Sequence, residues 1–389
     1  MTMSIAIAVL KETLAHERRV ALVPSVAAKL VKIGARLHLQ SGVGAAAQFD
    51  DSAYQDVIFS SDRNQLVGQA NIVLAVQPPT LEVIDAMSAE AILISFIYAE
   101  KSPELVQRLL DKKITCFAME RIPRIARAQS MDAVSSQAAL TGYYAVQFGA
   151  TQLLKTLPKI TTAAGIVGPA KVLVMGLGVA GLEEVATAHR LGAVVEAYDV
   201  RSETQEQALS RGASFVDTGV DARGHGGYAR ALNDAEKKQV DSVLSEHIRQ
   251  ADLIITTAAI PGKPSPKLIS HEQVKAMKAG AVIIDLSAEG GGNCVDTLAG
   301  ETIKIGDVSI VAPLNMASFL SSDASDLYSK NLYNFLTLIL KNNVIAIDWD
   351  DEVLAKTALT HAGILKNGVA LDRDAPGEQA ALALQNTST

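Results

Sequence analysis

The sequence predicts an α/β protein with two doubly wound parallel-sheet domains that long helices connect. Three observations lead to this fold class. Short apolar runs alternate with helical periodicities in both halves of the chain, which is the pattern of βαβ units. The second half contains the glycine-rich turn GLGVAG at 176–181, between an apolar run and a helical pattern. Two long helical patterns, at 131–157 and 317–340, flank this second half.

The composition is that of a globular protein whose length suits two domains. The 389 residues are too many for one compact core, and 49% of them are hydrophobic while 20% are charged. The net charge of −7 gives no electrostatic reason to expect nucleic acid as a partner. Cys116 and Cys294 form neither a disulfide framework nor a metal-binding pattern, which fits a reducing cytoplasm. No apolar run approaches the ~20 residues of a membrane span.

The first domain is predicted from strands and helices that alternate as far as residue 117. The expected strands are 5–10, 36–40, 72–76, 91–97 and 114–117. Helices are expected at 26–33, after Pro24, and at 103–111. Residues 344–366 are expected to return to the same domain. We therefore assign 1–130 plus 320–370 to a discontinuous first domain and 371–389 to a flexible tail.

The second domain is predicted to span 131–319. Its expected strands are 172–175, 194–198, 253–256, 282–285 and 309–311. After the glycine-rich turn, a helical pattern runs from Val185 to Leu191 and ends at Gly192. Strand, glycine turn, helix and strand in this order indicate a Rossmann-like unit.

The turn at 176–181 has the spacing and the surroundings of a dinucleotide-binding fingerprint. Gly176 allows the tight turn, and Gly178 lets the backbone approach a pyrophosphate. Gly181 lets the helix pack closely on the strand, and Val179 and Ala180 open that helix at the phosphates. The alternative interpretation is a glycine-rich turn in an α/β domain that binds no nucleotide.

Asp199 favours NAD(H) as the cofactor. It ends the strand 194–198 and lies 23 residues after Gly176. A carboxylate at this place accepts hydrogen bonds from the adenosine ribose and repels a 2′-phosphate. Val200 and Arg201 complete the expected adenosine site, although Arg201 could instead favour NADP(H).

Three loops of unusual composition are expected around the cofactor. Residues 219–228 contain four glycines and predict either a mobile loop that closes on the nucleotide or an inert insertion. Residues 260–266 contain three prolines and follow a strand, where a doubly wound sheet places the nicotinamide. Residues 287–294 offer close backbone approach through three glycines. The expected contacts from these loops and the strand ends are Tyr228, Thr257, Ala258, Pro261 and Glu289.

Five segments together resemble the NAD(H)-binding component of proton-translocating nicotinamide nucleotide transhydrogenase. They are PRIARAQSMDAVSSQAALTGYYAV at 123–146, the fingerprint region at 172–201, GGYAR at 226–230, TTAAIPGKPSP at 256–266 and DLSAEGGGNC at 285–294. The segment KETLAHERRVALVP at 11–24 is shared more widely with alanine dehydrogenases. The pair RAQSMD and GGYA is the most specific element of the resemblance.

The resemblance implies hydride transfer between NAD(H) on this chain and NADP(H) on a partner subunit. The transfer would be Si–Re specific and coupled to proton translocation. The implied assembly is a homodimer at the inner face of the cytoplasmic membrane. Its partners would be an NADP(H)-binding beta subunit and a short membrane subunit of the alpha-2 type. Hydride transfer releases no proton at the reacting carbons, so the site needs two rings held about 3–3.5 Å apart rather than an acid or base.

The resemblance also assigns the reaction to the loop 124–135. The implied residues are Arg124, Gln129, Asp132 and Ser135. Arg124 and Asp132 would pair to hold the loop. Gln129 would reach toward the partner's NADP(H), and Ser135 would contact the nicotinamide of NAD(H). Without the resemblance, these residues indicate a solvated charged loop before a helix, with Asp132 or Ser130 as the N-cap.

Two other functions stay open from the sequence. An alanine-dehydrogenase-like enzyme would oxidise an amino acid, but Gln77 and Glu100 stand at the places of that family's lysine and histidine. Arg19 remains, and we expect it to be a surface or helix-end charge rather than a substrate clamp. The other alternative is a non-catalytic NAD-binding module that regulates a partner.

Overall fold

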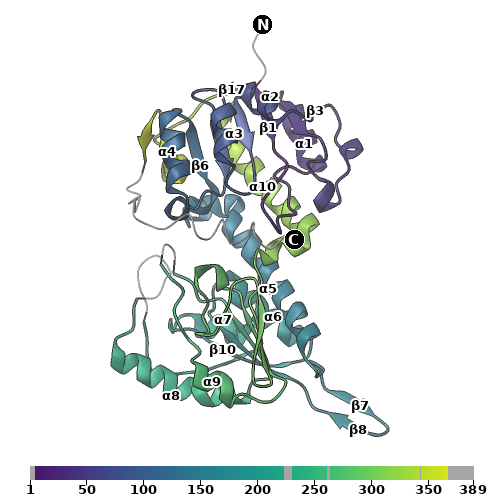
Figure 1. The fold of residues 1–389 in the computed structure, drawn as a ribbon, viewed down its shortest axis with the longest axis vertical. Coiled ribbons are helices and arrows are strands. Elements are labelled where there is room, and N and C mark those ends of the chain that lie inside the picture. Colours follow the sequence, from purple (N-terminus) through teal and green to yellow (C-terminus); the bar gives the residue numbers. More distant parts are fainter. Residues whose placement is uncertain (1–4, 223–229, 261–262, 342, 367–389) are drawn as a thin grey trace. The chain divides into compact units, whose positions relative to one another are not determined.

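The computed structural model describes residues 5–222, 230–260, 263–341 and 343–366, which form two compact α/β units (Figure 1). The first unit comprises the described residues of Met1–Gln137 and Leu320–Thr389, and the second is Ala138–Phe319. The chain passes from the first unit to the second within helix α5 (Ala133–Gln152).

The first unit contains an eight-stranded sheet in the order β3-β2-β1-β4-β5-β6-β18-β19. Its strands are β1 (Ala6–Val9), β2 (Arg36–Gln40), β3 (Ile58–Ser60), β4 (Ile72–Leu74), β5 (Ile92–Ser95), β6 (Thr115–Ala118), β18 (Ala358–His361) and β19 (Ile364–Leu365). The first six are parallel and have the Rossmann order 3-2-1-4-5-6. The C-terminal strands β18 and β19 extend this sheet antiparallel. The helices are α1 (Pro24–Lys32), α2 (Arg63–Gly68), α3 (Leu81–Ala86), α4 (Pro103–Asp111), α10 (Ser321–Ile339) and α11 (Glu352–Thr357).

Apolar side chains on both faces of this sheet form two separate clusters. Ile7 and Val9 of β1 pack in one cluster with Tyr328 and Phe335 of α10. Ala8, between them in sequence, packs in the other cluster. Successive strand residues point to opposite faces, so strands buried on both sides read as continuous apolar runs.

The second unit contains a seven-stranded sheet in the order β11-β10-β9-β12-β13-β15-β14. Its strands are β9 (Lys171–Met175), β10 (Val194–Tyr198), β11 (Ser214–Phe215), β12 (Leu253–Thr256), β13 (Val282–Asp285), β14 (Thr302–Ile305) and β15 (Val308–Val311). All pairings are parallel except that of β14 with β15. Its helices besides α5 are α6 (Val179–Arg190), α7 (Thr204–Ser210), α8 (Asp234–Gln250) and α9 (His271–Ala276). The predicted fold class, with two Rossmann-like doubly wound sheets, is confirmed.

The predicted bounds were accurate for short elements and wrong for the long helix. The structure reproduces β2, α4, β12 and β13 residue for residue. The helix predicted at 131–157 is instead α5, which ends at Gln152, before a turn that leads to Pro158. A proline disfavours helical backbone at the residue before it, which explains the early end. The helix after the glycine turn begins at Val179, because Gly181 hides the apolar period of its first turn.

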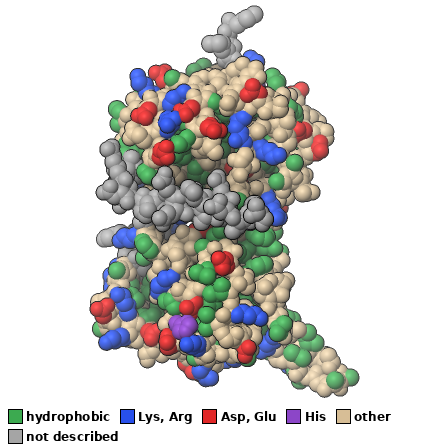
Figure 2. All heavy atoms as spheres, in the orientation of Figure 1, with side chains coloured by type: hydrophobic (Ala, Val, Ile, Leu, Met, Phe, Trp, Pro, Cys, Tyr) green, Lys and Arg blue, Asp and Glu red, His purple; other side chains and the backbone are tan. Residues whose placement is uncertain are grey.

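A β-hairpin that the sequence did not predict stands out from the second unit. Strands β7 (Ile160–Thr162) and β8 (Gly165–Val167) pair with each other, and all six of their residues are exposed. In Figure 1 this hairpin extends away from the sheet of its own unit. None of the helices in the described stretches of the chain has the length and apolar character that crossing a bilayer requires. On the face drawn in Figure 2, acidic and basic side chains are interspersed over each unit.

Candidate functional site

The glycine turn joins β9 to α6, and each of its glycines has a different reason to be there. Gly176 has a φ of 101°, a conformation that favours glycine. A Cβ on Gly181 would lie 1.8 Å from the carbonyl oxygen of Gly176, so only glycine lets α6 approach the strand this closely. A Cβ on Gly178 would meet no atom within 4 Å, and its φ is an ordinary −75°. Open space at Gly178 leaves room for a ligand phosphate to approach the backbone.

The N-terminus of α6 is built to accept an anion. Among the described residues, no side chain caps this end, and Val179 in the first turn is 44% exposed. The first amide groups of a helix have no partner within the helix, and the helix dipole favours negative charge there. Helix α5 supports this end closely, since a Cβ on Gly142 would lie 2.2 Å from the carbonyl oxygen of Ala180. The fingerprint therefore fits the pyrophosphate of a dinucleotide.

Asp199 is bonded to the fingerprint itself. Its Oδ2 accepts the N–H of Leu177 at 2.7 Å and the Nη2 of Arg201 at 2.7 Å. Its Oδ1 accepts the backbone N–H and the Nε of Arg201 at 2.9 and 2.8 Å. A carboxylate offers about four acceptor positions, and these contacts fill them. A ribose hydroxyl therefore has to displace some bonds from Arg201, which the sequence did not reveal. Val200 follows Asp199 as a half-buried residue packed against the core.

The loop after β12 is bonded to the glycine turn and to a buried amide. Thr257 Oγ1 donates to the carbonyl oxygen of Gly176 at 3.0 Å. Ala258 donates its N–H to Asn293 Oδ1 at 3.0 Å, and its carbonyl oxygen accepts from Asn293 Nδ2 at 2.8 Å. Asn293 is fully buried. Thr257 and Ala258 thus stand where the sequence placed the nicotinamide end of the site, with a rigid support behind them.

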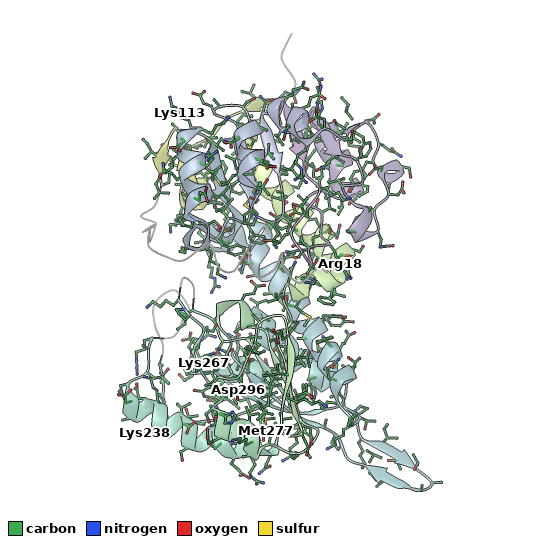
Figure 3. The ribbon with its side chains drawn as sticks, viewed as in Figure 1. Arg18, Lys113, Lys238, Lys267, Met277 and Asp296 are labelled. Carbon is green, nitrogen blue, oxygen red and sulfur yellow. The ribbon has the colours of Figure 1, made fainter. Side chains whose placement is uncertain are left out.

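The loop after β13 is organised by a second buried residue, Asp285. Its carboxylate accepts from four groups, namely the backbone N–H of Ser287, Asn293 and Cys294 and the hydroxyl of Thr297. Figure 3 shows the side chains of this region, where Lys267 is labelled. Lys267 Nζ donates to the carbonyl oxygen of Cys294 at 3.1 Å. Sequence reasoning missed Asn293 and Asp285, although a buried acid at a strand end and an asparagine after three glycines were visible signals.

The remaining cofactor predictions concern loop residues. Glu289 lies in the turn after β13, and its Oε1 accepts the N–H of Asn315 at 3.3 Å. Tyr228 and Pro261 lie outside the described residues, so the structure places neither of them.

The loop proposed for the reaction belongs to the first unit and precedes α5. It forms the 3₁₀ turn η5 (Ala126–Met131), on which Gln129 is exposed. Arg124 is an exposed side chain shortly before the turn. Asp132 follows the turn and caps α5, accepting the N–H of Ser135 at 2.9 Å and its hydroxyl at 2.6 Å. The capping role that the residues alone suggested for Asp132 is therefore present.

The expectation that Arg19 is a surface or helix-end charge was wrong. Arg19 is 5% exposed, and its Nη2 and Nε contact the carboxylate of Glu17 at 2.6 and 2.8 Å. Its Nη1 donates to Gln137 Oε1 at 2.8 Å, and Gln77 Nε2 donates to Glu17 at 2.7 Å. Burial raises the pKa of Glu17, but the hydrogen bonds and charge of Arg19 outweigh it and lower the pKa to about 2. A buried guanidinium requires such a partner.

The Glu17–Arg19 pair lies where a doubly wound sheet usually binds a ligand. Both residues follow β1 and Gln77 follows β4, the neighbouring strands between which the order of the first sheet reverses. Glu12 lies there too, accepting the N–H of Val76 at 2.6 Å, and burial raises its pKa to about 7. Glu100 is exposed in a short 3₁₀ turn. The chain's own carboxylate therefore occupies the arginine that a substrate carboxylate would need.

Helix α6 contains one buried acid with a different character. Glu184 is fully buried, and neither of its carboxylate oxygens has a hydrogen-bond partner among the described residues. Burial raises the pKa of Glu184 well above its ordinary value, so this carboxyl group is neutral near pH 7.

Two family models match nearly the whole chain. The N-terminal domain of alanine dehydrogenase/PNT matches residues 8–141, and the C-terminal domain of the same family matches residues 145–368. The first portion of the NAD(P) transhydrogenase alpha subunit of Rhodospirillum rubrum, itself a separate chain, is 41% identical over 373 residues, covering 92% of this chain and 97% of that protein. The alanine dehydrogenase of Halomonas elongata is 32% identical over 300 residues, covering 75% of this chain and 74% of that protein.

A solved structure has the same fold. The crystal structure of transhydrogenase from Sinorhizobium meliloti superimposes with a TM-score of 0.81 at 36% identity, covering 92% of this chain and 98% of that one. The chain belongs to the alanine dehydrogenase/PNT family, within which it shares more of its sequence with the transhydrogenase alpha subunit than with the alanine dehydrogenase compared here.

Proposed function

We propose that this chain is the NAD(H)-binding subunit of a proton-translocating transhydrogenase. It exchanges hydride with NADP(H) held by a partner subunit, and membrane subunits couple the transfer to proton translocation. The observation that carries the proposal is Gly178, which has open space and ordinary backbone in a turn fixed by Gly176 and Gly181. The protein itself gives no reason for glycine there, whereas a bound pyrophosphate does.

The residues of the second unit would hold NAD(H) as follows. The first amides of α6, at Val179 and Ala180, would bind the pyrophosphate, and Asp199 would bind the adenosine ribose. Thr257 and Ala258 would support the nicotinamide end, together with Tyr228, Pro261 and Glu289. Bound NADH supplies the hydride, and the chain's task is to orient it and to exclude water.

The loop of the first unit would complete the reaction site. Gln129 would contact the partner's nucleotide, and Ser135 the nicotinamide of NAD(H). Arg124 and Asp132 would hold the loop. Because the Ser135 hydroxyl donates to Asp132 at 2.6 Å, its oxygen lone pairs stay available to accept a hydrogen bond from a ligand amide.

The exposed hairpin supports the proposal of a homodimer. Ile166 and Val167 are 65% and 47% exposed on β8, and nearby in sequence Leu154 is 94% exposed. A two-stranded hairpin is only marginally stable in water, and grouped apolar side chains mark an interaction surface. A second copy of this chain would cover them. The proposed assembly sits on the inner face of the cytoplasmic membrane, bound to an NADP(H)-binding beta subunit and an alpha-2-type membrane subunit.

Hydride exchange with a partner is the activity that tests the proposal. The purified chain is mixed with an NADP(H)-binding transhydrogenase subunit, and transfer from NADH to NADP⁺ is followed. The expected result is transfer that requires both proteins. A parallel assay with pyruvate, ammonia and NADH should show no turnover, because Glu17 occupies Arg19. Turnover in the second assay would favour an amino-acid dehydrogenase, and NADH binding without either reaction would favour a regulatory module.

A further inference from the structure

The turn that presents Gln129 is held by side chains that come from distant segments of the first unit. The turn's own backbone hydrogen bonds are local, such as that from Ala128 N–H to the carbonyl oxygen of Ile125 at 3.0 Å. Ala128 is fully buried and Met131 is 6% exposed, while Gln129 between them is exposed. The two apolar residues anchor the turn in the core, so the base of the Gln129 side chain points outward.

Two amides of helix α10 fix the carbonyl group next to Gln129. The carbonyl oxygen of Ser130 accepts from Asn331 Nδ2 at 2.9 Å and from Asn334 Nδ2 at 3.0 Å. These asparagines stand three residues apart and therefore share one face of α10. Asn331 is 6% exposed, and its Oδ1 accepts the hydroxyl of Ser136 at 2.7 Å. One buried amide thus links the turn to the first turn of α5.

An ion pair holds the other side of the turn. Arg127 Nη1 and Nη2 contact the two carboxylate oxygens of Asp351 at 2.8 and 2.7 Å. Asp351 is itself the N-cap of α11, accepting the N–H groups of Val353 and Leu354 at 2.8 and 3.3 Å. The bidentate geometry fixes orientation as well as distance. Gln129 is therefore bracketed by an anchored Arg127 and an anchored Ser130.

We propose that Asn331, Asn334 and Asp351 are positioning residues, which hold the backbone on both sides of Gln129 in the orientation that hydride transfer requires. This inference rests on the proposed function. The three residues touch neither nucleotide in this role, and they act through the placement of Gln129. A displacement of ~1 Å at a reacting site can lower the rate about 10²-fold, so supporting bonds have a large effect on rate.

The first test separates the rate of transfer from NADH binding. Asn331→Ala, Asn334→Ala and Asp351→Asn are each reconstituted with the partner subunit. Asp351→Asn keeps an acceptor for the α11 cap but removes the charge that Arg127 pairs with. We expect kcat to fall roughly 10- to 100-fold while the Kd for NADH stays within about twofold of wild type. Lys330→Ala is the matched control, because its ion pair with Asp326 stays within α10, and it should keep the wild-type kcat.

The second test asks whether the effect passes through Gln129. In a Gln129→Ala background, Asn334→Ala should lower kcat no further, because coupled residues are non-additive. An equal additional loss would show a general structural role and overturn the inference.

Amide hydrogen exchange gives a readout that does not depend on activity. Exchange across 126–132 should become faster in Asn334→Ala and Asp351→Asn but not in Lys330→Ala. Unchanged exchange in the two variants would overturn the inference even if transfer were slower. If Gln129→Ala itself transferred hydride at the wild-type rate, the loop assignment in the proposed function would fail, while the exchange data would still decide whether these residues hold the turn.

Discussion

The carboxylate of Asp199 accepts the backbone N–H of Leu177 at 2.7 Å. The acid that ends β10 is thus bonded to the second residue of the glycine turn after β9. Both residues are buried, so the bond is shielded from water and orients the turn before any nucleotide binds. Ribose recognition and the shape of the phosphate site are therefore coupled in this protein.

Asp199→Ala should weaken NADH binding at least tenfold and relax the discrimination against NADPH. The variant loses the ribose acceptor and also leaves the Leu177 N–H without its partner, which costs about 1–3 kcal/mol for a buried donor. Calorimetric titration with NADH and NADPH measures both effects. Glu206→Ala, an exposed acid on α7, is the control. Unchanged NADH affinity in Asp199→Ala would remove this residue from the site.

Gly178→Ala and Gly181→Ala should have opposite profiles. Gly178→Ala meets no protein atom, so the empty protein should keep its thermal midpoint or gain slightly, by about 0.4–1 kcal/mol. Its NADH affinity should fall sharply, since the new methyl group faces the phosphate. Gly181→Ala clashes with the Gly176 carbonyl at 1.8 Å and should lose stability, by about 1–3 kcal/mol. Thermal unfolding with and without NADH distinguishes the two, and normal NADH binding by Gly178→Ala would contradict the phosphate assignment.

Glu184→Gln should stabilise the protein increasingly as the pH rises. The folded pKa of Glu184 is raised by burial, whereas its unfolded pKa is about 4.3. Its favourable contribution is therefore fully present below pH ~4 and is lost as the pH rises toward the folded pKa, at up to ~1.4 kcal/mol per pH unit. Denaturant midpoints of both proteins from pH 5 to 8 measure the difference, in steps on the order of one pH unit. A constant difference across this range would mean that the carboxyl group is ionised in the folded protein.

Glu17→Ala should destabilise the first unit by about 3–5 kcal/mol, because it leaves the buried Arg19 without its carboxylate. Sodium formate should restore some of the lost thermal stability by taking the place of the missing carboxylate, whereas sodium chloride should not. The double variant Glu17→Ala/Arg19→Leu should not respond to formate. Equal responses to the two salts would argue that the effect is general screening.

Gln129→Asn should reduce hydride transfer in the reconstituted complex about 10²-fold. The shorter side chain keeps its amide but withdraws it from the partner's nucleotide. NADH affinity and partner association should stay near normal, because the contact matters mainly in the transition state. Single-turnover transfer and calorimetry measure these quantities separately. Transfer at the wild-type rate would take this loop out of the reaction site.

Local chemistry explains what the sequence predicted correctly. Apolar period and length defined β2, α4, β12 and β13 to the residue, because these signals are carried within each segment. The glycines of the turn were assigned correctly to backbone geometry and close packing at Gly176 and Gly181, since these demands are set by neighbours in the same βα unit.

Long-range contacts explain what only the tertiary structure decided. Arg19 looked like a surface charge until the fold buried it against Glu17 and Gln137. The amide of Asn331 reaches Ser130 across 201 residues of sequence. The sequence by itself determined the two α/β units and the nucleotide turn, because periodicity and glycine geometry are local properties. The partners of the buried polar groups depended on which distant segments the sheets and α10 bring together, and no local pattern encodes that.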